Sequence, residues 1–233
     1  MIIHGDCLKV LENISSGTIS CIITSPPYKD KDGFSYAFMS EVFRQLYRVQ
    51  ANDTLFFLNF GHLAEDKFRP FGVCQLAMDS GYKLNETIIW VKNHYKPIQG
   101  ERRLNNLTEF IFLLYKGKMP KLNRLAIGIP YVDKSNAKRF NDGQDLHCAG
   151  NVWYIDYETI NHRDQKLHPD RFPLELPKRC IKLCGYNVEV VLDPFSGSST
   201  TCLATKQLGK EYIGIEKDET NYKISLERLF EKY

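Results

Sequence analysis

The chain has 233 residues, of which 43% are hydrophobic and 25% are charged. This composition is typical of a soluble globular protein, and the length is enough for one domain, or one domain with an insertion, around a substantial core. No apolar run is long enough to cross a bilayer, and the N-terminus lacks the basic and apolar regions of a signal peptide. The seven cysteines show no paired Cys-x-x-Cys spacing, so we expect no metal site and reduced thiols in the cytoplasm.

Basic residues gather in the middle of the chain. The net charge is only +3, but residues 92–139 hold eleven Lys or Arg against three Asp or Glu. The rest of the chain is therefore net acidic. A local basic block is typical of contacts with phosphates, and the alternative interpretation is an ordinary solvated surface.

In the first half of the chain, apolar runs alternate with segments of helical periodicity. Leu8, Leu11 and Ile14 recur at the spacing of a short helix. Strands are predicted at residues 2–3, 19–23, 54–60, 85–91 and 108–115, and helices at 38–49 and 67–79. Such alternation of strands and helices predicts an α/β protein.

The periodicity weakens after residue 116. Residues 116–162 are rich in Gly, Asn, Asp and Lys, and we interpret them as a small irregular insertion with a strand-like segment near its end. The regular pattern then returns, with a helix within 171–184, a strand at 190–192, a helix at 200–208, a strand at 212–215 and an amphipathic helix at 219–233. The chain is therefore divided into 1–115, the insertion 116–162, and 163–233.

The most informative stretch is the turn that follows strand 190–192. Asp193 and Pro194 end this strand, because proline cannot continue a central ladder. Residues 196–199 then form a small-residue turn, in which Gly197 lets the backbone approach a ligand. Strand, tight turn and helix together form a nucleotide-binding corner of an open parallel sheet, since the helix start offers unpaired N–H groups.

Two further observations bear on this turn. The strand at 212–215 ends in Glu216, where an acid holds ribose hydroxyls in dinucleotide-binding folds. The turn lacks the Gly-Lys-Ser/Thr of a P-loop and the Gly-x-Ser-x-Gly of a nucleophile elbow. A small-residue turn without a ligand is the remaining alternative.

A second functional stretch follows the buried strand 19–23. It reads Thr24-Ser25-Pro26-Pro27-Tyr28, and its two consecutive prolines forbid both helix and ladder. The chain must therefore leave the sheet at its carboxyl edge, which is where open α/β sheets hold ligands. The alternative interpretation is an exposed proline turn.

These motifs together resemble those of the DNA amino-methyltransferases. The family's catalytic (Asp/Asn/Ser)-Pro-Pro-(Tyr/Phe) matches Ser25-Pro26-Pro27-Tyr28, and its cofactor turn matches 195–199. His168-Pro169-x-x-Phe172-Pro173 resembles a third motif near the methionine end of the cofactor, and Gly5-Asp6-Cys7 a fourth near its adenosine. The catalytic motif precedes the cofactor turn, as in the beta class. One residue departs from the family's usual Phe-x-Gly-x-Gly: Ser199 replaces the last Gly, which is strained if its φ is positive.

The resemblance implies a Rossmann-like methyltransferase fold, with a mostly parallel seven-stranded sheet, one antiparallel strand and helices on both faces. It implies S-adenosylmethionine as the cofactor and no metal. The expected cofactor-binding residues are Asp6, Cys7, Thr24, His168, Pro169, Phe172, Asp193, Phe195, Ser196, Gly197, Ser198, Ser199 and Glu216. The segments 1–115 and 163–233 are then the catalytic and cofactor-binding halves of one domain, and 116–162 is the target-recognition insertion.

The resemblance also implies the chemistry. An exocyclic amine is a poor nucleophile, because its lone pair is delocalised into the base. The expected catalytic residues are Ser25, Pro26, Pro27 and Tyr28. Ser25 and the Pro26 carbonyl would accept the two amine hydrogens, the prolines would fix these acceptors, and Tyr28 would stack on a base flipped out of the duplex.

In this family, Ser before Pro-Pro-Tyr resembles the N4-cytosine enzymes. The expected function is therefore site-specific methylation of cytosine N4 in double-stranded DNA, in the cytoplasm at the bacterial nucleoid. N6-adenine or RNA methylation is the alternative within the same chemistry, and a non-catalytic DNA-binding module is the alternative from another class. A homodimer partner and a restriction endonuclease that acts in the same system without direct binding are both compatible with the resemblance.

Overall fold

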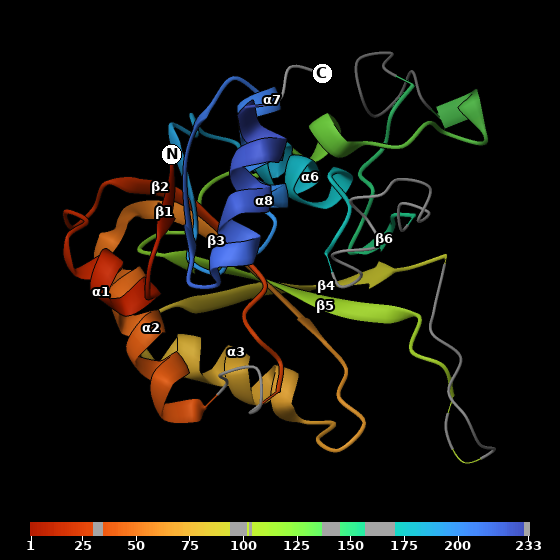
Figure 1. The fold of residues 1–233 in the computed structure, drawn as a ribbon. Helices are drawn as coiled ribbons and strands as arrows, with labels where there is room; N and C mark the ends of the chain where they lie inside the picture. The colour runs from red at the N-terminus through yellow and green to blue at the C-terminus, as the bar shows by residue number, and fades with distance from the viewer. Residues whose placement is uncertain (30–34, 94–101, 103, 137–144, 157–170, 231–233) are drawn as a thin grey trace.

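We analysed a computed structural model of the chain, which describes residues 1–29, 35–93, 102, 104–136, 145–156 and 171–230. Figure 1 shows helices packed around one central sheet. In the described residues the strands are β1 (Ile2–His4), β2 (Ile19–Thr24), β3 (Gln50–Gly61), β4 (Lys83–Val91), β5 (Thr108–Lys116), β6 (Val152–Tyr154), β7 (Val190–Asp193) and β8 (Glu211–Glu216). The helices are α1 (Cys7–Glu12), α2 (Tyr36–Val49), α3 (Arg69–Asp79), α6 (Glu175–Leu183), α7 (Thr200–Gln207) and α8 (Glu219–Phe230), with short 3-10 turns at Arg124–Ile127 and Lys134–Asn136.

The sheet has the order β1-β8-β7-β2-β3-β5-β4-β6. Neighbouring strands pair in parallel except at β5, which runs antiparallel to both β3 and β4. The predicted fold class is confirmed, including its one antiparallel strand. The described sheet has eight strands rather than seven, because β6, the strand-like segment of the insertion, pairs with β4 at the sheet edge.

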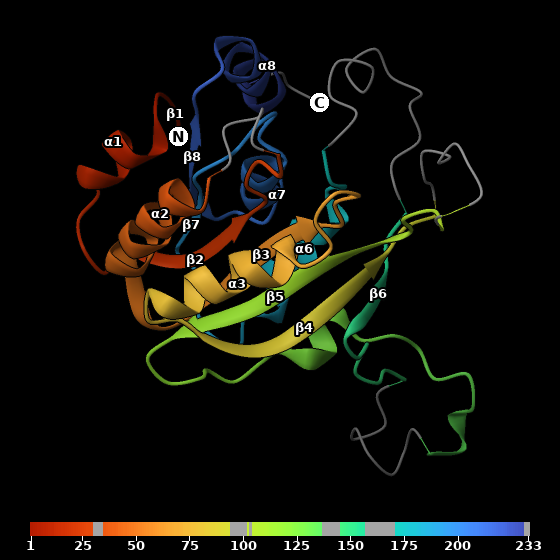
Figure 2. The same ribbon diagram turned by 90° about the horizontal axis from the view of Figure 1, so that it is seen from below.

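The central strands bury side chains on both faces, as their continuous apolar runs predict. Along β3, for example, Phe56 and Leu58 lie in one core cluster and Leu55 and Phe57 in the other, because successive side chains of a strand point to opposite faces. Helices α1, α2 and α3 cover the first face, and α6 covers the second (Figure 2).

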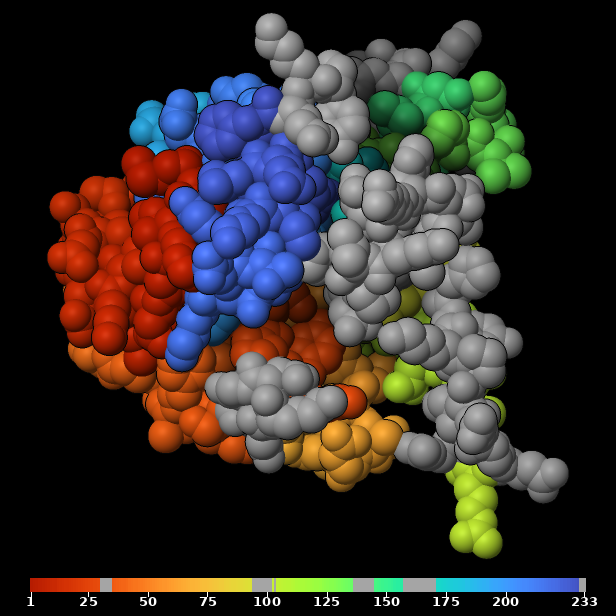
Figure 3. Space-filling model, in the orientation of Figure 1, coloured from red at the N-terminus to blue at the C-terminus, as the bar shows by residue number. Residues whose placement is uncertain are grey.

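The two ends of the chain meet on one side of the molecule. β1 pairs in parallel with β8, and α8 packs against β1 and β8. Figure 3 shows this arrangement at the surface, where the N-terminal segment and the C-terminal segment lie side by side. In the parallel register of β1 and β8, His4 pairs with Glu216. The motif at residues 5–7, which follows His4, therefore lies at the same edge of the sheet as Glu216. No helix in the described part of the chain is long and apolar enough to span a membrane.

Candidate active site

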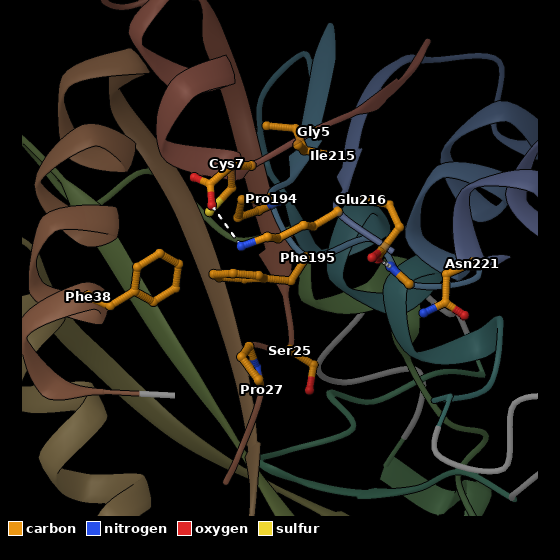
Figure 4. A pocket seen from close by; sticks show the side chains of 13 residues that line it. Gly5, Cys7, Ser25, Pro27, Phe38, Pro194, Phe195, Ile215, Glu216 and Asn221 are labelled. Atoms are coloured by element: carbon orange, nitrogen blue, oxygen red, sulfur yellow. Dashed lines mark hydrogen bonds and ion pairs between the residues drawn. The ribbon is translucent and has the colours of Figure 1, made fainter. Parts of the chain in front are cut away.

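A cavity of about 760 Å³ opens at the carboxyl ends of β1, β8, β7 and β2. Figure 4 shows the ring of Phe195 in its middle, with Ser25 and Pro27 on one side of the ring and Glu216 and Asn221 beside it. The cavity is lined by Gly5, Asp6, Cys7, Ser25, Pro27, Phe38, Pro194, Phe195, Gly197, Ile215, Glu216, Lys217 and Asn221. Seven of the residues expected at the site line it: Asp6, Cys7, Ser25, Pro27, Phe195, Gly197 and Glu216.

The two motifs meet because their strands are neighbours. β2 and β7 pair in parallel, with Cys21 opposite Val191 and Ile22 opposite Leu192. At the strand ends, the buried Thr24 hydroxyl donates to Asp193 Oδ1 at 2.7 Å. The chain therefore leaves both strands at the same edge of the sheet, and Ser25 and Gly197 open into one cavity.

Asp193 is a buried carboxylate that organises the start of the cofactor turn. The same Oδ1 that accepts from Thr24 also accepts from the Phe195 N–H, at 3.1 Å. Burial raises the pKa of Asp193 to about 6, which these hydrogen bonds only partly offset. Thr24 and Asp193 are not among the residues that line the cavity, so their role here is to fix the loops that do.

The turn itself has a left-handed backbone. Gly197 has a φ of +52° and Ser199 a φ of +60°, and Ser199 precedes the first turn of α7. The strain that a positive φ imposes on a serine is therefore present, at about 1–2 kcal/mol. Ser196 joins the turn to β8, since its N–H donates to the Ile215 carbonyl at 3.0 Å.

Helix α8 holds this turn from the other side. The Ser225 hydroxyl lies 2.8 Å from the Gly197 carbonyl and 2.8 Å from the Asn221 carbonyl, and its one hydrogen can be donated to either. The buried Arg228 guanidinium donates to the Ser198 carbonyl, to the Ser198 hydroxyl at 2.9 Å and to the Thr200 hydroxyl at 3.3 Å. Sequence reasoning missed both residues, because an Arg in an amphipathic C-terminal helix is normally assigned to the solvent face.

Glu216 lines the cavity and also accepts two backbone hydrogen bonds. Its Oε2 accepts from the Gly197 N–H at 2.8 Å, and its Oε1 accepts from the Asp218 N–H at 2.7 Å. Burial raises the pKa of Glu216 above its usual value. The carboxylate therefore anchors the left-handed turn and also presents its remaining lone pairs to the cavity.

The motif at residues 5–7 forms the upper wall in Figure 4. The Asp6 carboxylate caps α1 by accepting from the Leu8 N–H at 3.1 Å, and it makes an ion pair with Lys217 at 3.3 Å. Cys7 is buried at the start of α1, and burial raises the pKa of its thiol to about 12. A thiol with this pKa is not a nucleophile at neutral pH.

The catalytic motif is packed against the end of β3. The Ser25 hydroxyl lies 2.9 Å from the Tyr28 hydroxyl, and the Tyr28 ring stacks on Phe60 with centroids 4.2 Å apart. Arg69 donates to the Tyr28 carbonyl at 3.1 Å, which fixes the backbone after the prolines. Pro26 is buried and does not line the cavity.

A polar cluster behind Tyr28 was not foreseen from the sequence. The Tyr28 hydroxyl lies 3.3 Å from Asn59 Oδ1 and 3.3 Å from Glu109 Oε2, and the other Glu109 oxygen makes an ion pair with Lys92. Burial and the charge of Glu109 raise the pKa of Tyr28 well above its usual value, so the side chain remains a phenol. The signal in the sequence is a polar residue next to an apolar run: Asn59 follows residues 55–58 in β3, and Glu109 precedes residues 110–114 in β5.

Other expected cofactor-binding residues lie away from the cavity. Ser196, Ser198 and Ser199 belong to the turn but are not among the residues that line it. Phe172 packs against the core cluster on the α6 face of the sheet. His168 and Pro169 lie outside the described residues. Within the described ranges, no group of three or more His, Cys, Asp or Glu side chains is placed to hold a metal ion.

Comparison with known proteins gives the family. The DNA methylase family of N6 and N4 methyltransferases matches residues 19–227. Type II methyltransferase M.XycI of Xanthomonas campestris pv. cyanopsidis is 24% identical over 97% of this chain and 86% of its own length. The DNA adenine methyltransferase YhdJ of Escherichia coli K12 is 27% identical over 98% of this chain and 82% of its own length.

Solved structures agree on the fold. The PvuII DNA methyltransferase, described as cytosine-N4-specific, superposes with a TM-score of 0.79 at 20% identity, over 99% of this chain and 86% of that chain. M1.HpyAVI in complex with S-adenosylmethionine superposes with a TM-score of 0.69 at 22% identity, over 99% of both chains. The chain therefore belongs to the N6/N4 DNA methylase family and is a DNA methyltransferase.

Proposed function

We propose that this protein transfers the methyl group of S-adenosylmethionine to the exocyclic N4 amine of cytosine in double-stranded DNA. The observation that carries this proposal is that Ser25 and Gly197 line one cavity, although they come from opposite ends of the chain. One side of the cavity then offers acceptors for a nucleobase amine, and the other offers a turn suited to a nucleoside cofactor.

The cavity has the chemistry that S-adenosylmethionine requires. Its walls combine two aromatic rings, Phe38 and Phe195, with the carboxylates of Asp6 and Glu216. The rings supply apolar surface for an adenine, and Glu216 has lone pairs for ribose hydroxyls beyond those used by two backbone N–H groups. When bound, the cofactor supplies a methyl group already activated by its sulfonium.

The catalytic motif orients the amine. We assign the two amine hydrogens to Ser25 Oγ, which lines the cavity, and to the carbonyl of Pro26, which is buried beside it. These two bonds draw the nitrogen lone pair out of the ring and toward the methyl group. Pro26 fixes its own φ and restricts the backbone of Ser25, and Pro27 restricts the backbone of Pro26, so little entropy is lost when the amine binds. Tyr28 borders the amine-binding side of the site through its hydroxyl contact with Ser25.

The target base must leave the duplex to reach this site, because its amine is paired inside the helix. Residues 92–106 and the insertion 116–162, with its excess of Lys and Arg, provide the phosphate contacts and read the target sequence. Segments 1–115 and 163–233 act as the catalytic and cofactor-binding halves. Such a protein works on bacterial DNA in the cytoplasm, alone or as a homodimer, with or without a restriction endonuclease in the same system.

The choice of cytosine rests on Ser25. In the family that this chain resembles, Ser before Pro-Pro-Tyr is typical of the N4-cytosine enzymes, and the PvuII enzyme is described as cytosine-N4-specific. N6-adenine methylation is the second candidate, because YhdJ, a DNA adenine methyltransferase, is similar along 98% of this chain. Both candidates use the same fold, cofactor and in-line transfer.

Sequencing of host DNA with and without the gene tests base and site together. We expect N4-methylcytosine at one short sequence only when the gene is present, and its loss when the gene carries Ser25→Ala. N6-methyladenine at that sequence would replace the cytosine assignment with the second candidate. If the purified protein binds S-adenosylmethionine but leaves every nucleic acid unmethylated, the protein is a non-catalytic binding module.

A further inference from the structure

The Tyr28 hydroxyl has one hydrogen and three oxygen neighbours. These neighbours are Ser25 Oγ at 2.9 Å, Asn59 Oδ1 at 3.3 Å and Glu109 Oε2 at 3.3 Å. A phenol can donate to only one of them. The direction of every hydrogen bond in this cluster therefore depends on which neighbours can themselves donate.

Asn59 and Glu109 can only accept at the atoms that face Tyr28. The Asn59 amino group donates to the Phe110 carbonyl at 3.1 Å, which leaves the amide oxygen toward Tyr28. The Glu109 carboxylate is ion-paired with Lys92, and both side chains are only 15% exposed. Neither oxygen carries a hydrogen, so the Tyr28 hydrogen must point to one of these two atoms. If it pointed to Ser25 instead, the phenol oxygen would face two acceptors with no hydrogen between them.

The direction of the Tyr28 hydrogen also determines the direction of the Ser25 hydrogen. Because the Tyr28 hydrogen is directed at Asn59 or Glu109, the 2.9 Å contact is a hydrogen bond only if Ser25 donates to Tyr28. We infer that Glu109 and Asn59 are positioning residues that act through Tyr28 to turn the Ser25 hydrogen away from the cavity, so that the Ser25 lone pairs face the substrate amine. This inference rests on the proposed function, since it assigns these lone pairs to the amine hydrogens.

The arrangement also explains how a neutral hydroxyl can serve at this position. When Tyr28 donates to Glu109, the Glu109 charge lies two hydrogen bonds from Ser25 Oγ, and a chain of aligned hydrogen bonds polarises each member. Ser25 Oγ thereby becomes a better acceptor than an isolated hydroxyl. Glu109 supplies, at a distance, part of the negative charge that an aspartate in the motif would supply directly.

Packing holds Tyr28 in this arrangement. The ring stacks on Phe60, and Gly61 lies so close that a Cβ there would be 2.8 Å from Tyr28 Cε2 and 3.3 Å from the Glu109 carboxyl carbon. Any side chain at position 61 would therefore force the Tyr28 ring to shift. The raised pKa of Tyr28 is consistent with a phenol that keeps its hydrogen beside a carboxylate.

Neutron diffraction of the deuterium-exchanged full-length protein tests the inference without any need for activity. We expect the Tyr28 deuterium to point toward Asn59 or Glu109, and the Ser25 deuterium to point toward Tyr28. A Ser25 deuterium directed into the cavity, or a Tyr28 deuterium directed at Ser25, would overturn the inference. The identity of the methylated base has no influence on this result, so the proposed function and the inference fail separately.

A double-mutant cycle gives the kinetic test on plasmid DNA that the wild-type protein methylates. Under single-turnover conditions with saturating DNA and cofactor, Glu109→Gln is expected to slow methyl transfer about 10- to 100-fold, the cost of one hydrogen bond to a charged group. Cofactor affinity should stay within about twofold, because Glu109 acts on the amine side. Tyr28→Phe removes the link, so the double variant should be no slower than Tyr28→Phe alone.

Two outcomes of the cycle would contradict this role. Multiplicative effects of the two substitutions would mean that Glu109 acts by a route other than Tyr28. An equal loss of cofactor affinity and rate would mean that Glu109 only supports the fold. Tyr82→Phe is the matched control, since it removes the hydroxyl of another buried tyrosine. That hydroxyl donates to Gln50 Oε1 at 2.7 Å, outside the cavity. The methyl-transfer rate of this variant should equal that of the wild type.

Discussion

The Thr24 hydroxyl and the Asp193 carboxylate, 169 positions apart, are joined by a hydrogen bond of 2.7 Å. This contact lies at the ends of two adjacent parallel strands, β2 and β7. The catalytic motif begins at the residue after Thr24, and the cofactor turn begins just after Asp193. The contact therefore fixes the spacing between the two loops that line the cavity, which the proposed function assigns to the target base and the cofactor.

Asp193 should make stability depend on pH. Its folded pKa, about 6, is above the usual value of 3.8, so the folded protein holds this proton more tightly than the unfolded chain. At a pH below both pKa values, the buried carboxyl does not lower the free energy of unfolding. The cost grows between pH 4 and 6 and is complete above pH 6, at about 3 kcal/mol for a shift of this size.

The variant Asp193→Asn removes this titration and keeps an oxygen for Thr24. Relative to wild type, its free energy of unfolding should rise by about 2 kcal/mol between pH 4.5 and 7.5. Urea denaturation of both proteins without cofactor measures this difference. A difference that does not change with pH would contradict the buried, proton-holding carboxyl. Asp79→Asn, which removes an exposed charge at the end of α3, is the control for loss of a charge.

Replacing Ser199 with glycine should relieve backbone strain in the turn. Its φ of +60° is one that glycine adopts freely and serine does not. Ser199→Gly should therefore raise the free energy of unfolding by up to about 1 kcal/mol, and the β-branched Ser199→Val should lower it. In contrast, Ser40→Gly in the exposed part of α2 should lower it by about 0.5–1 kcal/mol. If both Ser-to-Gly variants lose stability equally, the left-handed geometry is wrong.

Glu216 should govern cofactor affinity more than catalysis. Glu216→Ala removes an acceptor from the cavity wall and leaves the Gly197 N–H without its partner. We expect S-adenosylmethionine to bind about 10- to 100-fold more weakly, the cost of one hydrogen bond to a charged group, in titration calorimetry. The rate at saturating cofactor should change much less. A large loss of rate with unchanged affinity would place Glu216 in the chemistry instead. Glu175→Gln on α6, whose exposed carboxylate pairs with Arg179, should change neither quantity.

The fold was predictable because its strands are buried on both faces. Runs such as 54–60 and 108–115 are mostly apolar, and they alternate with helices of clear periodicity. The residues at which strands begin and end were harder to predict from the sequence. β3 begins at Gln50, earlier than predicted, because Gln50 and Thr54 are polar but buried and bond to each other at 3.0 Å.

The site was predictable where function depends on a short motif, and not where it depends on tertiary contacts. Short motifs predicted Ser25, Pro27, Phe195 and Gly197 as site residues, and all four line the same cavity. Glu109 gave no such signal, since its partner Tyr28 is 81 positions away and the two meet only through the antiparallel pairing of β5 with β3. Arg228 likewise reaches Ser198 only because α8 folds back over the turn.

Methyl transfer by the purified protein tests the central claim most directly. Duplex DNA is incubated with labelled S-adenosylmethionine, digested to nucleosides and analysed by mass spectrometry. The label should appear in N4-methylcytosine, and Ser25→Ala should abolish most of it while cofactor affinity is retained. Label in N6-methyladenine, or a Ser25→Ala variant as active as wild type, would contradict the account.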